Sequence, residues 1–126
     1  MNYYDSLNRL IDTIEKNLEN EIDYNELAKV IGTSSYTMQR IFVFLTGMTL
    51  TEYIRKRRLS KAAEELRKTE NRVIDIATKY GYDSPVSFSN AFKKIHGQSP
   101  ANFRKSNTEV TFFSKIQFNP DIVGRK

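Results

Sequence analysis

The chain has 126 residues, 39% of them hydrophobic and 28% charged, with a net charge of +5 and an isoelectric point near 9.5. This length and apolar content suit one folded unit of roughly 100–150 residues and argue against a disordered chain. Because there is no cysteine and only one histidine, His96, disulfides, a thiolate nucleophile and a histidine-based metal centre are excluded, and we expect no enzyme, no cofactor and no metal.

Helix start and stop signals divide residues 1–106 into seven short helices. Apolar residues at helical spacing predict an amphipathic helix over about 5–19. Asp23 with Glu26 forms a capping-box pattern that opens a second helix, and Gly32 ends it. A third helix begins at Ser34 or Ser35 and runs to Gly47.

The fourth helix is the longest. Thr49 with Glu52 forms a second capping-box pattern, and the helix extends to about Lys68. Asn71 is expected to cap a fifth helix that ends near Gly81.

Two serine–proline pairs open the last helices. Ser84–Pro85 and Ser99–Pro100 each place a capping serine before a proline at the first helical position. The sixth helix ends at Gly97, and the seventh is short. No alternating strand pattern precedes residue 107, so we expect an all-α fold.

An internal repeat organises these helices. Segment 27–53 matches segment 76–103, with one residue inserted in the second copy. The matched pairs are Ala28/Ala77, Gly32/Gly81, Ser34/Ser84, Phe42/Phe92, Gly47/Gly97 and Tyr53/Phe103. Each copy predicts a helix, a glycine turn and a second helix, which is a helix-turn-helix. We expect a first unit over about 5–48, a linker helix over about 49–68 and a second unit over about 69–106, all within one domain of residues 1–106.

The second helix of each copy has two different faces. The faces expected to be buried carry Met38, Ile41, Phe42 and Leu45, and Phe88, Ala91, Phe92 and Ile95. The opposite faces carry Tyr36, Gln39, Arg40 and Val43, and Val86, Ser89, Asn90 and Lys93. A recognition helix in the DNA major groove needs such a free face, and Arg and Gln pair well with guanine and adenine. An ordinary solvated face is the alternative.

Positive charge is concentrated in the middle of the chain. Residues 1–26 hold seven acids and two bases (−5), whereas residues 27–106 hold fifteen bases and six acids (+9). This pattern is typical of a surface that binds a polyanion, and a solvated basic surface without a partner is the alternative. Arg55–Lys56–Arg57–Arg58 is the densest run, but these residues circle the helix and cannot all face DNA. The linker helix, about 29 Å long, approaches the ~34 Å between major-groove segments one turn apart.

Segment 73–105 carries Gly-aromatic-x-Ser, Phe-x-x-x-Phe-Lys-Lys and Gly-x-Ser-Pro-x-x-aromatic-Arg. The residues concerned are Ala77, Gly81, Tyr82, Ser84, Phe88, Phe92, Lys93, Lys94, Gly97, Ser99, Pro100, Phe103 and Arg104. This pattern resembles the signature of AraC/XylS-type transcription regulators. The resemblance covers about residues 5–106 and is nearest to Rob-like and multiple-antibiotic-resistance-type regulators, whose DNA-binding unit lies at the N-terminus.

The resemblance implies a seven-helix bipartite domain that acts as a monomer on one asymmetric site of double-stranded DNA, with RNA polymerase as a second partner. It assigns base contacts to Tyr36, Gln39, Arg40, Val86, Ser89 and Asn90. The residues expected at the DNA backbone are Ser35, Arg55, Lys56, Arg58, Ser84, Lys93 and Lys94.

The sequence departs from the family pattern at three positions. Val43 and Phe44 follow Phe42, where relatives commonly have a lysine or another polar residue. Phe44 is then either buried or part of an exposed apolar patch for a partner. Asn90 stands where arginine is frequent, so we expect weaker base contacts from the second unit.

Residues 107–126 differ in character from the helical part. Val110, Phe112, Phe113, Ile116 and Phe118 predict an extended tail or linker that Pro120 interrupts. Such a linker leads to a C-terminal effector-binding domain in some relatives, so the chain is either part of a longer regulator or a short stand-alone one. The sequence has neither a signal-peptide pattern nor a membrane-length apolar run, and we expect a cytoplasmic protein with no membrane partner.

Two functions remain in competition. The first is a sequence-specific transcription regulator, favoured by outward Gln39 and Arg40 and by the +9 charge of residues 27–106. The second is a protein-interaction module on the same scaffold, with Val43 and Phe44 facing a protein. We expect the first.

Overall fold

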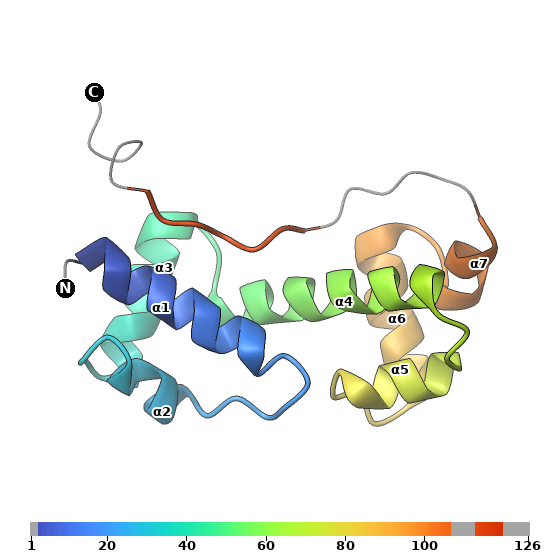
Figure 1. Ribbon diagram of the computed structural model, residues 1–126, viewed down its shortest axis with the longest axis horizontal. Helices are drawn as coiled ribbons and strands as arrows, with labels where there is room; N and C mark the ends of the chain where they lie inside the picture. The colour runs from blue at the N-terminus through green and yellow to red at the C-terminus, as the bar shows by residue number, and fades with distance from the viewer. Residues whose placement is uncertain (1–2, 107–112, 120–126) are drawn as a thin grey trace. The chain divides into compact units, whose positions relative to one another are not determined.

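The computed structural model describes residues 3–106 and 113–119. This part of the chain contains seven α-helices and no strand, so the all-α prediction is confirmed (Figure 1). The helices are α1 (Tyr3–Lys16), α2 (Tyr24–Lys29), α3 (Ser35–Thr46), α4 (Leu50–Lys68), α5 (Val73–Lys79), α6 (Pro85–His96) and α7 (Pro100–Lys105). None of these helices is long and apolar enough to cross a membrane.

Side-chain caps explain where most helices begin. The Asp23 carboxylate accepts hydrogen bonds from the first backbone N–H groups of α2, and Thr49 Oγ1 accepts one from Glu52 N at 3.0 Å. Ser99 caps α7 in the same way. The expected cap of α5 by Asn71 is wrong, because the Asn71 side chain instead donates a hydrogen bond to Glu65 Oε2. Helix α5 starts one residue later, after Arg72, without a side-chain cap.

The chain divides into two compact units, Met1–Tyr53 with Lys115–Lys126, and Ile54–Ser114. The boundary lies within α4, so its first turn belongs to the first unit and the remaining turns to the second. In the first unit, α1 buries one apolar stripe, and Met38 and Phe42 of α3 are at most 1% exposed. The ring of Phe42 lies 5.5 Å from that of Tyr53, which joins α3 to the start of α4.

The core of the second unit is built on the apolar stripe of α4. It contains Leu59, Ala62, Ala63, Leu66, Ile76, Ala77, Tyr80, Phe88, Phe92 and Phe103. The rings of Phe92 and Phe103 lie 5.4 Å apart, so α6 and α7 share this core. At the same place His96 Nε2 lies 3.1 Å from the Leu59 carbonyl oxygen, which ties the end of α6 to α4.

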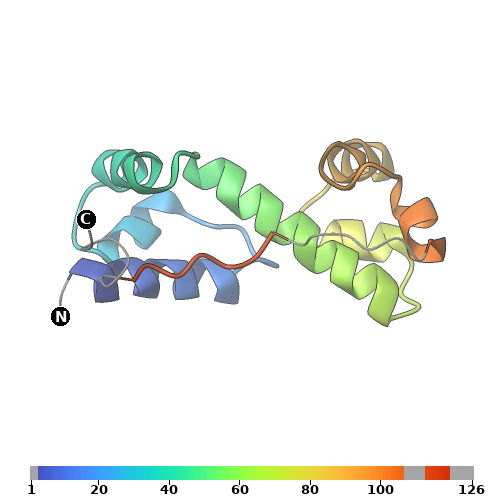
Figure 2. The same cartoon turned by 90° about the horizontal axis from the view of Figure 1, so that it is seen from above.

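Segment 113–119 is neither helix nor strand. Its residues 115–119, which belong to the first unit, lie beside α1 (Figure 2). The Asn8 side chain pairs with both backbone groups of Phe118, donating to its carbonyl at 2.9 Å and accepting from its N–H at 2.8 Å. Lys115 forms an ion pair with Asp12. The strand-like pattern expected at Val110 and Phe112 lies outside the described residues.

Candidate nucleic-acid interface

Helices α3 and α6 repeat each other in three dimensions as well as in sequence. Every residue from 36 to 48 is buried, half-buried or exposed in the same way as the residue fifty positions later. Met38 and Phe42 are buried, as are Phe88 and Phe92, and each helix keeps its other face free. The predicted two-faced pattern is confirmed at these four buried residues. The other four side chains expected to be buried are only half-buried: Ile41, Leu45, Ala91 and Ile95.

The two helices also begin and end in the same way. Ser34 Oγ accepts a hydrogen bond from Thr37 N, and Ser84 Oγ accepts one from Ser87 N. Each helix closes on a glycine with φ of 78°, in the left-handed region that favours glycine, and the glycine N–H donates to the carbonyl four residues back at 2.8 Å. Local sequence thus gives both helices the same length of twelve residues.

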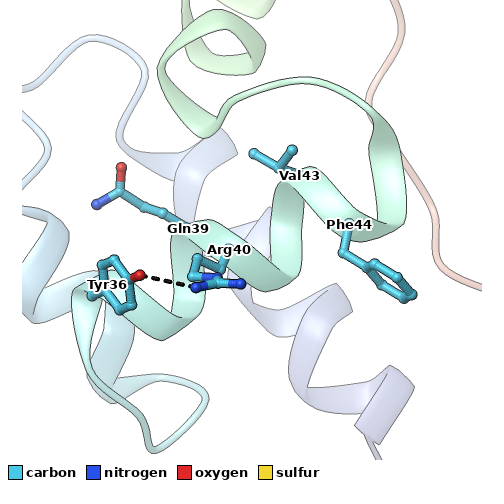
Figure 3. A pocket seen from close by; sticks show the side chains of 5 residues that line it. All are labelled: Tyr36, Gln39, Arg40, Val43 and Phe44. Carbon is cyan, nitrogen blue, oxygen red and sulfur yellow. Dashed lines mark hydrogen bonds between the residues drawn. The ribbon is translucent and has the colours of Figure 1, made fainter.

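The free face of α3 carries the base-contact candidates of the first unit. Tyr36 is 67% exposed, and its hydroxyl accepts a hydrogen bond from Arg40 Nη1 at 2.9 Å (Figure 3). Gln39 is half-buried and donates through Nε2 to Ser35 Oγ at 3.0 Å. Both polar side chains are therefore held by neighbours on their own helix, which presents them to the same side.

Three exposed apolar side chains border the same face. A hollow of about 550 Å³ is lined by Tyr36, Gln39, Arg40, Val43 and Phe44. Phe44 is 86% exposed, so of the two alternatives drawn from the sequence the buried one is wrong. A neighbouring hollow of about 410 Å³ adds Tyr3 of α1, a residue that belongs to no sequence motif. Only packing could identify Tyr3, since α1 has no motif of its own.

The free face of α6 differs in chemistry. Val86 is 68% exposed, Asn90 is exposed and Ser89 is half-buried. Lys93 and Lys94 are both exposed in the last turn. Ser84, expected at the DNA backbone, uses its hydroxyl within the protein, because it caps α6 and bonds to Ser87 Oγ at 3.0 Å.

The basic run of α4 splits between two sides of the helix. Arg57 is buried to 8% exposure and donates to the Phe113 carbonyl, and the Lys56 ammonium lies 5.4 Å from the centre of the Phe113 ring. Arg55 and Arg58 instead act on Tyr82 in the turn before α6. Burial raises the pKa of Tyr82, and the positive charges of the two arginines oppose that rise. Arg55 and Arg58 therefore lie on the side of α4 that faces the second helix-turn-helix.

A family model described as "Helix-turn-helix domain" matches residues 27–106. The chain is 42% identical over 102 residues to the HTH-type transcriptional activator AarP of Providencia stuartii, covering 81% of this chain and 76% of that protein. Solved structures show the same fold. One is a transcriptional regulator with an AraC-type DNA-binding domain from Chromobacterium violaceum, with a TM-score of 0.75, 23% identity and coverage of 80% of this chain and 90% of that one.

A second solved structure is more similar in sequence. The DNA-binding domain of AdpA, a global transcriptional factor, in complex with a target DNA, is 27% identical to this chain. The TM-score is 0.72, and the match covers 79% of this chain and 90% of that one.

Proposed function

Because the chain belongs to the AraC-type family of helix-turn-helix transcription regulators, we propose that it binds one asymmetric site on double-stranded DNA as a monomer. The chain is a bacterial transcription regulator with a DNA-binding helix-turn-helix domain. In this proposal α3 and α6 enter successive major-groove segments. One polypeptide then carries two recognition helices, so the two-fold symmetry of a dimer is not required.

The shared exposure of residues 36–48 and 86–98 is the observation that carries this proposal. Each helix packs one face into the core through two buried residues and leaves most of the opposite face exposed, as a recognition helix requires. The AdpA domain was solved with its target DNA, which supports DNA as the partner of this fold.

The base contacts proposed for the two units are unequal. On α3, Gln39 can pair bidentately with adenine, Arg40 with guanine, and Tyr36 can contact a base edge beside them. On α6, Asn90 can pair with adenine, the Ser89 hydroxyl can donate to or accept from a base edge, and Val86 can contact a thymine methyl group. The first unit therefore has the stronger means of discrimination.

Phosphate contacts fix the protein on the duplex without carrying sequence information directly. The proposed backbone contacts are Ser35, Arg55, Lys56, Arg58, Ser84, Lys93 and Lys94. Arg55, Arg58, Lys93 and Lys94 have the best support, because these cations lie on the side of Tyr82 or in the last turn of α6. Lys56 and Ser84 must first leave the Phe113 ring and Ser87, respectively.

Two further proposals follow from the family. RNA polymerase is the second partner, and the similarity to an activator supports activation of transcription. The cytoplasm is the proposed location, because a bacterial transcription regulator meets DNA there, and DNA binding without catalysis is the proposed activity.

Selection of bound sites from random DNA, followed by affinity measurements over a salt series, tests the proposal. If five to seven phosphates are neutralised, log K against log salt has a slope of about −4.5 to −6. A slope near zero contradicts a nucleic-acid partner. Sedimentation of the complex should show one chain per duplex, and two chains on a palindromic site would contradict the monomer.

The 86% exposure of Phe44 favours one competing function, a protein-interaction module. That function predicts no DNA shift at any salt concentration and no sequence enriched by selection. Selection therefore separates the two functions in one experiment.

A further inference from the structure

Helices α3 and α6 differ at the C-terminal end of their free faces. In the internal repeat, Val43 and Phe44 occupy the positions of Lys93 and Lys94. All four side chains are exposed, to 42% at Val43 and 86% at Phe44. The last turn of α3 has no basic residue, whereas that of α6 has both lysines. Equivalent positions thus present hydrocarbon in one unit and ammonium groups in the other.

Charge follows the same division between the units. The first unit, residues 1–53 and 115–126, holds seven bases and nine acids (−2), whereas residues 54–114 hold thirteen bases and six acids (+7). Arg40 is the one basic residue of α3. Because affinity for the DNA backbone depends on the number of phosphates that are neutralised, the first unit gains little from phosphates and must gain affinity from base edges.

The exposed apolar groups of α3 continue the face that carries Gln39 and Arg40. All five side chains around the 550 Å³ hollow project from α3, and at 3.6 residues per turn they span about 140° of its circumference (Figure 3). Val43 lies one turn beyond Gln39, near the middle of this face, and Phe44 lies at its edge beyond Arg40. When a base contacts Gln39 or Arg40, the adjacent bases therefore lie close to the side chains of Val43 and Phe44.

We propose that Val43 and Phe44 form a contact surface for thymine methyl groups, so that the first unit selects a thymine-containing half-site. Hydrocarbon side chains distinguish thymine in the major groove through its C5-methyl group. DNA is favoured over a protein as the occupant because the surface is continuous with the proposed base contacts and because its repeat counterpart holds two lysines. The inference rests on the proposed function, since it requires α3 to lie in the major groove.

Replacing thymine by uracil tests this surface, because uracil lacks only the C5-methyl group. Each thymine of the selected site is changed singly, and the affinity of the full chain is measured. We expect about fourfold weaker binding at one or two thymines of the α3 half-site, the equivalent of ~0.8 kcal/mol for one buried methyl-sized group. Thymines outside the two half-sites serve as the reference and should show no change.

Variants connect the methyl groups to the two side chains. In Val43→Ala or Phe44→Ala, the uracil effect should disappear at the thymine that the side chain contacts. The double variant Val43→Lys/Phe44→Lys copies the end of α6, and it should lose the uracil effect while the salt slope steepens by about one unit for each lysine that reaches a phosphate. Ile74→Ala is the control, because Ile74 is an apolar residue of α5 with 45% exposure. It should leave both readouts unchanged.

Three outcomes would contradict the thymine contact surface and leave the proposed DNA-binding function intact. One is a selected site whose thymines all tolerate uracil within twofold. Another is a uracil effect that persists in both alanine variants. A third is normal DNA binding by the alanine variants together with lost self-association or lost transcription with RNA polymerase, which would assign the surface to a protein. A chain that binds no DNA contradicts the proposed function instead. Because both side chains are exposed, melting temperatures should stay unchanged in every variant, and this is checked first.

Discussion

Arg40 and Tyr36 pair with each other one turn apart on α3. The guanidinium donates to the tyrosine hydroxyl at 2.9 Å and its carbon lies 5.5 Å from the ring centre. Both side chains are exposed, and among the described residues Arg40 forms no ion pair with an acid. Arg40 is therefore available for a base and contributes little to folding.

Arg40→Ala should lower discrimination at a guanine of one half-site by about 1–3 kcal/mol, because a bidentate pair is lost. The free energy of unfolding should change by no more than about 0.5 kcal/mol, as expected for an exposed residue. Asn90→Ala, at the equivalent position of α6, should cost less affinity. Site selection and urea unfolding on the same variants provide both readouts. Lost stability with unchanged site preference would show that Arg40 is a structural residue.

Lys93→Ala should weaken binding to all DNA sequences alike, because a phosphate contact carries no direct sequence information. The slope of log K against log salt should become shallower by about one unit. Lys16→Ala is a suitable control, since Lys16 ends α1 outside both helix-turn-helix motifs. Equal changes in slope for the two variants would contradict a specific phosphate contact at Lys93.

The free energy of unfolding should decrease as the pH is lowered, because His96 takes up a proton more readily in the unfolded chain than in the folded one. Burial between α4, α6 and α7 lowers the pKa of His96, and the hydrogen bond with the Leu59 carbonyl opposes only part of that effect. That bond requires a proton on Nε2, and Nδ1 is buried with no hydrogen-bond partner in the described residues. The unfolded chain binds a proton near pH 6.5, whereas the folded chain binds one only at a lower pH. This contribution to stability is therefore present above pH 6.5 and is lost as the pH falls towards the folded pKa.

Urea unfolding between pH 5 and pH 8 checks this expectation. The difference in stability between the wild type and His96→Leu should be constant above pH 7 and should shrink as the pH falls below 6.5. A difference that does not depend on pH would show that His96 has the same pKa in both states.

Asn8→Ala should destabilise the first unit by about 1–3 kcal/mol, because it removes two hydrogen bonds to the Phe118 backbone, each worth about 0.5–1.5 kcal/mol. Asp12→Ala is the matched comparison on the same helix. It removes an ion pair with Lys115 whose side chains are 51% and 42% exposed, and such a pair contributes about 0–1 kcal/mol. Denaturant unfolding measures both, and a larger loss for Asp12→Ala would contradict the role given to Asn8.

The helices and their faces could be predicted from the sequence because the interactions that define them are local. A capping serine accepts a hydrogen bond from the backbone N–H three residues later, as at Ser34 and Ser84. The period of 3.6 residues fixed which side chains of α3 and α6 share a face. The predicted cap at Asn71 was wrong because the Asn71 side chain donates a hydrogen bond to Glu65, six residues away on α4.

Only the tertiary structure decided which of the predicted contact residues are exposed and which are occupied by other parts of the protein. Periodicity could not separate a buried Phe44 from an exposed one, because that depends on whether α1 covers the flank of α3, and α1 leaves it 86% exposed. Likewise, four consecutive basic residues look equivalent in sequence, yet Arg57 is occupied by the carbonyl of Phe113, a residue 56 positions away. Asn8 and Phe118 are 110 positions apart, and no local pattern connects them. Local propensity determines the helices, but contacts between distant residues form only when the chain has folded and the free energy of packing selects among the exposed and buried alternatives.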